Sequence, residues 1–117
     1  MTLHYNGEIQ IKKVRCGDFG NNSYVIIDPT TRKSVIIDTP AEPEKTLAET
    51  QDTEVMAILI THNHADHLVG LDHIRSQTKA PVWIHPADAS ILSVPPEHPH
   101  QDNEVLRLGG TELKVIH

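Results

Sequence analysis

Four side chains that bind metal ions well lie within six consecutive positions of this 117-residue chain: His62, His64, Asp66 and His67. They follow the apolar run at residues 56–60, which has the length and composition of a buried strand. In an extended backbone, side chains two positions apart point to the same side, so His62 and His64 can bind one ion through neutral imidazole nitrogens. The chain then turns into a predicted helix, which brings Asp66 and His67 toward a second position beside the first.

This mixture of imidazole and carboxylate ligands suits zinc, and iron or manganese would also accept it. A divalent ion in such a site lowers the pKa of bound water toward about 7 and polarises a carbonyl or phosphoryl oxygen. Two ions about 3.5–4 Å apart can share one hydroxide nucleophile. The segment therefore predicts hydrolysis without a protein nucleophile. The simpler interpretation, a polar loop with solvated histidines, is disfavoured by the spacing of the four side chains between a strand and an amphipathic helix.

The pattern of apolar and turn residues predicts the elements that position this segment. Leu68, Leu71 and Ile74 fall three apart and form one stripe of a helix. Consecutive apolar residues in two β-branched runs, 23–28 and 33–38, indicate a sheet that is covered on both faces. The full set of predicted elements comprises strands at 8–15 (with Ile9, Ile11 and Val14 engaged), 23–28, 33–38, 56–60, 81–85, 105–108 and 112–116, helices at 44–51 and 66–76, a helical turn at 86–92, and loops at 16–22 and 95–103.

Composition limits the class of protein. A hydrophobic fraction of 38% and a charged fraction of 22% fit one globular domain, residues 1–117, with an aliphatic core because aromatics are only 3%. A net charge of −6 disfavours nucleic acid as a partner. Cys16 is the single cysteine, so a reducing compartment is expected, with a small-residue role for Cys16 itself. The N-terminus has no apolar stretch of signal-peptide length, and no run is long enough for a membrane helix; we expect a cytoplasmic protein without a membrane partner.

The run T-H-N-H-A-D-H at residues 61–67 contains an H-x-H-x-D-H signature, and in this the chain resembles the metallo-β-lactamase superfamily. Supporting stretches surround it. I-I-D-T-P at residues 36–40 resembles the strand-ending Asp motif of that family, although Pro40 stands where glycine is common. N-S-Y-V-I at residues 22–26 resembles the early strand, and Gly70 is placed as in the usual D-H-x-x-G continuation. The resemblance extends from about residue 8 to residue 117.

The resemblance implies an α/β (α+β) fold, an αββα sandwich with metals at the edge between two sheets. It implies that His62 and His64 serve a first metal and that Asp66 and His67 serve a second, with two zinc ions in the complete domain. Asp66 would also orient the nucleophilic water, and Asp38 would support the metal ligands through hydrogen bonds.

The activity implied by the resemblance is that of a metal-dependent hydrolase, which uses a metal-bound hydroxide on an ester, thioester or amide of a small molecule. The T-H-x-H-A-D-H run and Gly70 look most like glyoxalase-II-like hydrolases of small thioesters. Persulfide dioxygenase-like iron enzymes share the signature and are the alternative, which metal identity and oxygen consumption would distinguish. β-Lactam hydrolysis has weaker support, since no export signal is present.

Members of the family carry further metal ligands downstream of the signature. The closing run L-K-V-I-H at residues 113–117 resembles the strand that leads into the next ligand, with His117 just before it. We therefore expect the chain to be the N-terminal half of the fold, which alone binds metal weakly and catalyses poorly. A second alternative is a non-catalytic fragment that needs a complementing chain, or that self-associates through the uncompleted sheet.

The remaining histidines are weaker candidates. His85, at the end of a predicted strand, is a candidate residue of the substrate cleft. His73 is expected on the surface of its helix, and His98 and His100 are expected to be solvated.

Overall fold

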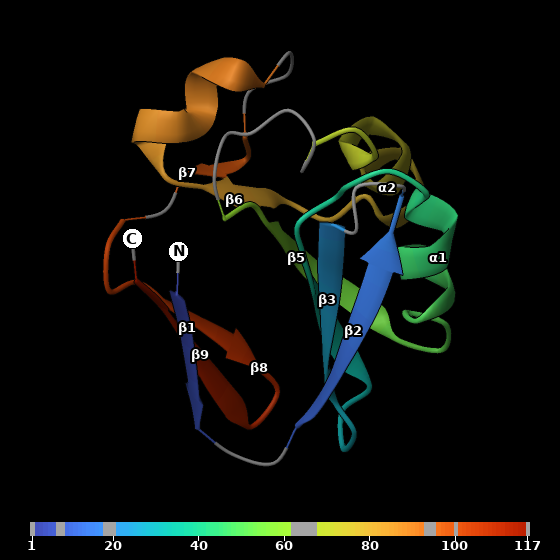
Figure 1. The fold of residues 1–117 in the computed structure, drawn as a ribbon. Coiled ribbons are helices and arrows are strands. Elements are labelled where there is room, and N and C mark those ends of the chain that lie inside the picture. The colour runs from blue at the N-terminus through green and yellow to red at the C-terminus, as the bar shows by residue number, and fades with distance from the viewer. Residues whose placement is uncertain are drawn as a thin grey trace.

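The computed structural model describes residues 2–6, 9–17, 21–61, 68–92, 96–99 and 101–116. They form two β-sheets that face each other, with helices on the outer side of the larger sheet (Figure 1). Among the described residues no helix is long and apolar enough to cross a membrane.

The larger sheet has six strands in the order β2-β3-β4-β5-β6-β7. Its first three strands are antiparallel neighbours, whereas β4, β5, β6 and β7 run parallel. The connections between the parallel strands contain the helices, as parallel pairing requires. The bounds of these elements are β2 Gln10–Cys16, β3 Asn21–Asp28, β4 Lys33–Ile37, α1 Pro43–Ala48, β5 Glu54–Leu59, α2 Leu71–Thr78, β6 Val82–Ile84, a 3₁₀ helix at Pro86–Ile91, and β7 His98–Pro99.

The smaller sheet has three strands in the order β1-β9-β8, and brings the first described residues beside the last. β1 is Thr2–Asn6, β8 is Val105–Leu108 and β9 is Thr111–Ile116. All its pairs are antiparallel, and Figure 1 shows it packed across from the larger sheet.

The central strands of the larger sheet, β3 to β6, are buried on both faces, which explains their consecutive apolar residues. One face packs Ile36, Ile58 and Ile84 against α1 and α2, and Ile74 of α2 is fully buried there. The opposite face carries Leu59 and the other alternate residues, which pack between the sheets against Leu106, Leu108 and Leu113. The α/β sandwich predicted from the sequence is therefore confirmed, with one helix layer and two sheets among the described residues.

Several boundaries differ from the sequence predictions. β2 continues to Cys16, which is 1% exposed, so the prediction of a loop at this residue is wrong. Ile11 is 50% exposed because β2 is an edge strand whose buried side chains are Val14 and Cys16. β1 and β7 were not predicted, and both depend on pairing with strands distant in sequence.

The helices are shorter than predicted, or shifted. α1 ends at Ala48, and the next two residues form a turn. Glu49 N–H donates to Thr46 O, and Thr50 N–H donates to Leu47 O. α2 begins at Leu71 and ends before Lys79, which takes a left-handed conformation; the part of the predicted helix at residues 66–67 lies outside the described residues.

A buried carboxylate joins the turns of two hairpins from opposite sheets. Asp28 Oδ1 accepts hydrogen bonds from the N–H groups of Thr30 (2.9 Å) and Thr31 (3.4 Å) in the β3–β4 turn. Asp28 Oδ2 accepts a third from Gly110 N–H (3.1 Å) in the β8–β9 turn. Gly109 has a φ of +60°, and a Cβ there would lie 2.1 Å from Asp28 Oδ2. The glycine therefore permits both the turn and the contact.

We expect Asp28→Asn to lower stability at neutral pH, because an amide nitrogen cannot accept the bond from Gly110. The pKa of Asp28 is lowered from 3.8, chiefly by the hydrogen bond from Thr30 N–H; burial opposes this, and the N–H groups of Gly110 and Thr31 add to it. The stabilisation is thus present above the ordinary pKa and is lost as pH falls through the lower pKa of the folded state.

Urea unfolding of both proteins at several pH values checks this expectation. The gap between their midpoints should narrow below about pH 4. Asp52→Asn, at an exposed position, is the matched control. A gap that stays constant from neutral to acid pH would contradict the role of the charge.

Candidate metal centre

The four predicted metal ligands, His62, His64, Asp66 and His67, lie outside the described residues, and their roles stay predictions. In the part of the chain that the structure describes, no three His, Cys, Asp or Glu side chains are close enough to bind an ion together. The residues on both sides of the segment are described, and they define how the fold holds its two ends.

The segment follows the carboxyl end of β5, in the middle of three parallel strands. Ile37 of β4 pairs with Leu59 of β5, which pairs with Trp83 of β6, so the three strands end side by side. The pairing continues one step further, since Ile60 N–H donates to Trp83 O (2.9 Å). Ligand sites of open α/β sheets commonly lie at this edge. The site predicted from sequence therefore starts where this fold class favours one.

Asp38, directly after β4, holds the residue before the predicted ligands. Its Oδ1 accepts a hydrogen bond from Thr61 N–H (2.8 Å), and its Oδ2 accepts one from the Thr61 hydroxyl (2.7 Å). Asp38 is 5% exposed and has a φ of 64°, in the left-handed region. The Ser23 hydroxyl lies 3.0 Å from Asp38 O and so fixes the backbone at this point. Asp38 thus fixes Thr61, and its support of the ligands themselves stays a prediction.

Gly70 holds the other end of the segment against the same connection. Its N–H donates to Thr39 O (2.8 Å). A Cβ on Gly70 would lie 2.6 Å from Pro40 O and 2.9 Å from Pro43 Cβ. Only glycine allows α2 to begin this close to residues 39–43. This steric limit is a physical reason for the glycine at position 70 of the D-H-x-x-G pattern.

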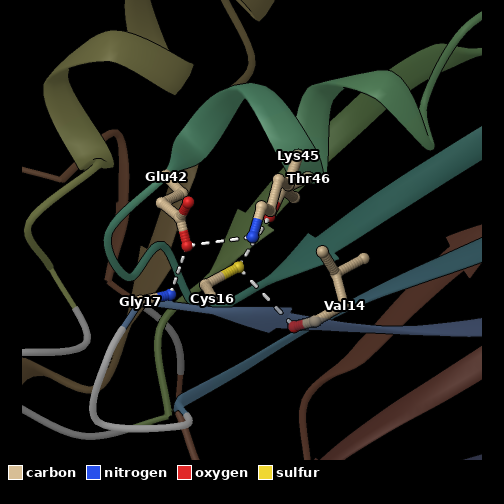
Figure 2. A network of polar contacts seen from close by, with 6 residues as sticks. All are labelled: Val14, Cys16, Gly17, Glu42, Lys45 and Thr46. Atoms are coloured by element: carbon tan, nitrogen blue, oxygen red, sulfur yellow. Dashed lines mark hydrogen bonds and ion pairs between the residues drawn. The ribbon is translucent and has the colours of Figure 1, made fainter.

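A second carboxylate, on Glu42, ties the end of β2 to the start of α1 (Figure 2). Glu42 Oε1 accepts hydrogen bonds from Gly17 N–H (2.6 Å) and from Lys45 Nζ (3.0 Å). These contacts lower the pKa of Glu42, the Gly17 hydrogen bond most. Sequence reasoning missed this residue, because nothing local connects it with a glycine 25 positions away.

Cys16 lies beside this contact and is buried. Its Sγ is 3.6 Å from Val14 O and 3.8 Å from the Thr46 hydroxyl (Figure 2). The small-residue role expected for Cys16 fits this buried environment.

The other histidines differ in their surroundings. His85 follows β6 at the carboxyl edge and is half-buried, so its place in a substrate cleft stays a prediction. His73 is exposed on α2, as predicted. His98, predicted to be solvated, is only partly so: its side chain is 40% exposed, but its ring stacks on Trp83, with centroids 3.8 Å apart, and pairs with Glu104. His100 and His117 lie outside the described residues.

The described residues form an α/β sandwich, and the predicted metal ligands follow its central strand β5 in the sequence. The sequence pattern of the metallo-beta-lactamase superfamily matches residues 16–115, and this chain belongs to that superfamily.

Individual relatives agree with this assignment. An uncharacterised protein of Aquifex aeolicus (strain VF5) is 28% identical over 92% of this chain and 58% of its own length. A hydroxyacylglutathione hydrolase of Jannaschia sp. (strain CCS1) is 33% identical over 82% of this chain and 38% of its own length. The crystal structure of the BLEG-1 B3 metallo-beta-lactamase superposes with a TM-score of 0.76 at 22% identity, over 86% of this chain and 57% of that protein. The chain thus spans about two fifths to three fifths of the proteins it matches.

We expect Thr61→Val to destabilise the protein by about 1–3 kcal/mol, because the buried Asp38 carboxylate loses a hydroxyl donor. Thr61→Ser keeps the hydroxyl and should retain most of the stability. Urea unfolding at neutral pH measures both. Equal midpoints for the two variants would show that the hydroxyl contributes nothing.

We expect Gly70→Ala to lower the free energy of unfolding by about 1–3 kcal/mol, because the added methyl group collides with Pro40 O and the Pro43 ring. Gly110→Ala is the matched control, since a Cβ at Gly110 meets nothing within 4 Å. Thermal unfolding of the two variants makes the comparison, and a Gly70 variant as stable as the control would refute the steric argument.

Proposed function

We propose that this chain carries the metal-binding part of a hydrolase that cleaves a small-molecule thioester with a metal-bound hydroxide. The observation that carries the proposal is the run His62-x-His64-x-Asp66-His67 directly after Thr61, which Asp38 holds at the carboxyl end of β5. Membership of the metallo-beta-lactamase superfamily supports it.

The donor set fits zinc. Three imidazoles and one carboxylate are common zinc ligands, and each can be in its binding form at neutral pH. In this proposal His62 and His64 hold one ion, and Asp66 and His67 hold a second. When bound, the metal supplies a water of lowered pKa and polarises the substrate carbonyl. Asp66 would also orient that water by accepting a hydrogen bond from it.

The described residues contribute by ordering the segment before metal binds. A ligand loop that is free pays conformational entropy when it closes around an ion. Asp38 restricts the chain before His62 through two hydrogen bonds to Thr61, and Thr39 O restricts it after His67 through Gly70. Fixing both ends lowers this cost, and with it the dissociation constant for metal.

A thioester substrate is favoured over other carbonyl compounds by the named relatives. The Jannaschia protein and a Rhodobacter capsulatus protein 35% identical to this chain are both hydroxyacylglutathione hydrolases. Each matches over 38% of its length, so residues outside the matched part would also contribute to substrate binding. In this proposal His85 lines the cleft, since it follows β6 beside the start of the ligand segment.

The test is a metal titration of the chain and of two variants, with thioester hydrolysis followed in parallel. His64→Ala should weaken zinc binding by at least about tenfold and lower hydrolysis of a glutathione thioester, slow as it is in the chain alone, to the rate without metal. His73→Ala, which removes an exposed histidine from α2, should change neither.

Other outcomes would overturn the proposed ligands or favour one of the alternative functions. Unchanged zinc affinity in His64→Ala would overturn the ligand assignment. Bound iron with thiol-dependent oxygen consumption would favour the persulfide dioxygenase-like alternative. Zinc binding without hydrolysis, restored by a complementing chain, would favour an incomplete unit.

A further inference from the structure

The β4–α1 connection, residues 38–42, begins and ends with a residue in the left-handed conformation. Asp38 has a φ of 64° and Glu42 a φ of 58°. Residues other than glycine take this conformation at a free-energy cost, and surrounding contacts must hold them in it. Each of these two residues has a carboxylate that is held by another part of the chain.

The residues between them contact the far flank of the predicted metal-binding segment. Thr39 O accepts the Gly70 N–H, and Pro40 O lies so close to Gly70 that a Cβ there would be 2.6 Å away. Asp38 contacts the near flank at Thr61. The shape of the connection therefore determines where both flanks lie relative to each other.

Glu42 fixes the second end of this connection through the end of β2. β2 is antiparallel to β3, which is antiparallel to β4, so β2 ends at the same edge as β4. There Gly17 N–H donates to Glu42 Oε1 at 2.6 Å (Figure 2). A Cβ on Gly17 would lie 3.3 Å from Ala41 Cβ. The connection is thus held against β2 at one end and against Thr61 at the other.

Local explanations for Glu42 do not account for this contact. Glu42 occupies the N-cap position of α1, but its side chain makes no capping hydrogen bond to the helix. Its ion pair with Lys45 joins side chains that are 40% and 52% exposed, and pairs of this kind contribute little. The short bond to Gly17, between segments distant in sequence, is the contact that restrains the chain.

We propose that Glu42 is a positioning residue for the metal-binding segment, acting through the 38–42 connection; this role rests on the proposed function. The carboxylate holds the left-handed turn before α1, the turn places Thr39 O and Pro40 O, and these place Gly70. Asp38 places Thr61 directly, through the two hydrogen bonds that its carboxylate accepts from that residue. Two acidic residues therefore fix the flanks of the segment, at Thr61 and Gly70, without binding the metal.

Amide hydrogen exchange of the metal-free protein tests the first part of this proposal. Glu42→Gly removes the carboxylate but tolerates a positive φ, so it separates the contact from backbone strain. We expect the protection of the Thr61 and Gly70 amides to fall about three- to tenfold relative to the amides of Ile58 and Ile60 in the sheet. Glu42→Gln retains an acceptor for Gly17 N–H and should stay within about twofold of the original protein.

Glu49→Gly is the matched control. Glu49 also lies at an end of α1, and its side chain, 41% exposed, makes one ion pair with a lysine, Lys12. It should leave the Thr61 and Gly70 amides unchanged. An equal fall in Glu49→Gly, a fall shared by Ile58 and Ile60, or no fall in Glu42→Gly would each overturn the positioning role.

Cobalt titration tests the second part, with the visible absorption of bound Co²⁺ as the readout. Glu42→Gly should raise the apparent dissociation constant about three- to tenfold and change the spectrum, and Glu42→Gln should restore both. Equal cobalt binding by the original protein and by Glu42→Gly would overturn the link between Glu42 and the metal. If the original protein and His64→Ala behave alike, the proposed function fails, and amide exchange still decides whether Glu42 orders the flanks.

Discussion

The structure depends on the parallel pairing of β5 with β4 on one side and with β6 on the other. β5 is buried on both faces, with Ile58 against the helices and Leu59 between the sheets. A shift of one residue would exchange the two faces of the strand, so burial fixes its register. In this register β4, β5 and β6 end side by side, and Asp38 after β4 lies within hydrogen-bonding distance of Thr61 after β5. The contact between Asp38 and Thr61 is therefore a consequence of how the core packs.

Strand pairing fixes where β4, β5 and β6 end, but it does not fix the path of the chain beyond those ends. Further contacts are needed to fix that path. Here the connection at residues 38–42 takes that role. Its two left-handed residues have their carboxylates bound by Thr61 and by Gly17, and the carbonyl group between them binds Gly70. Strained backbone conformations are commonly maintained in this way, by surrounding contacts that exclude the other conformations.

The sequence predicted most of the larger sheet, since runs such as residues 33–38 and 56–60 carry an unambiguous apolar pattern. It misjudged elements whose formation depends on a distant partner. Ile11 lies on an edge strand with one buried face, so its hydrophobicity gave a wrong prediction of burial. The prolines and polar residues around His98 predict a solvated side chain, yet its partly exposed ring stacks on Trp83 of the adjacent strand.

The sequence by itself determined the candidate metal ligands: their kinds and their spacing are local, and residues 62–67 contain all four predicted ligands. It also determined which segments are strands, because alternation and burial leave a periodic pattern. The tertiary structure alone decided which carboxylates hold Thr61, the start of α1 and the hairpin turns in place. Glu42 meets a glycine 25 positions away, and Asp28 meets one 82 positions away. Such contacts have no local signature, since they exist only after the core has fixed the strands that bring the two residues together.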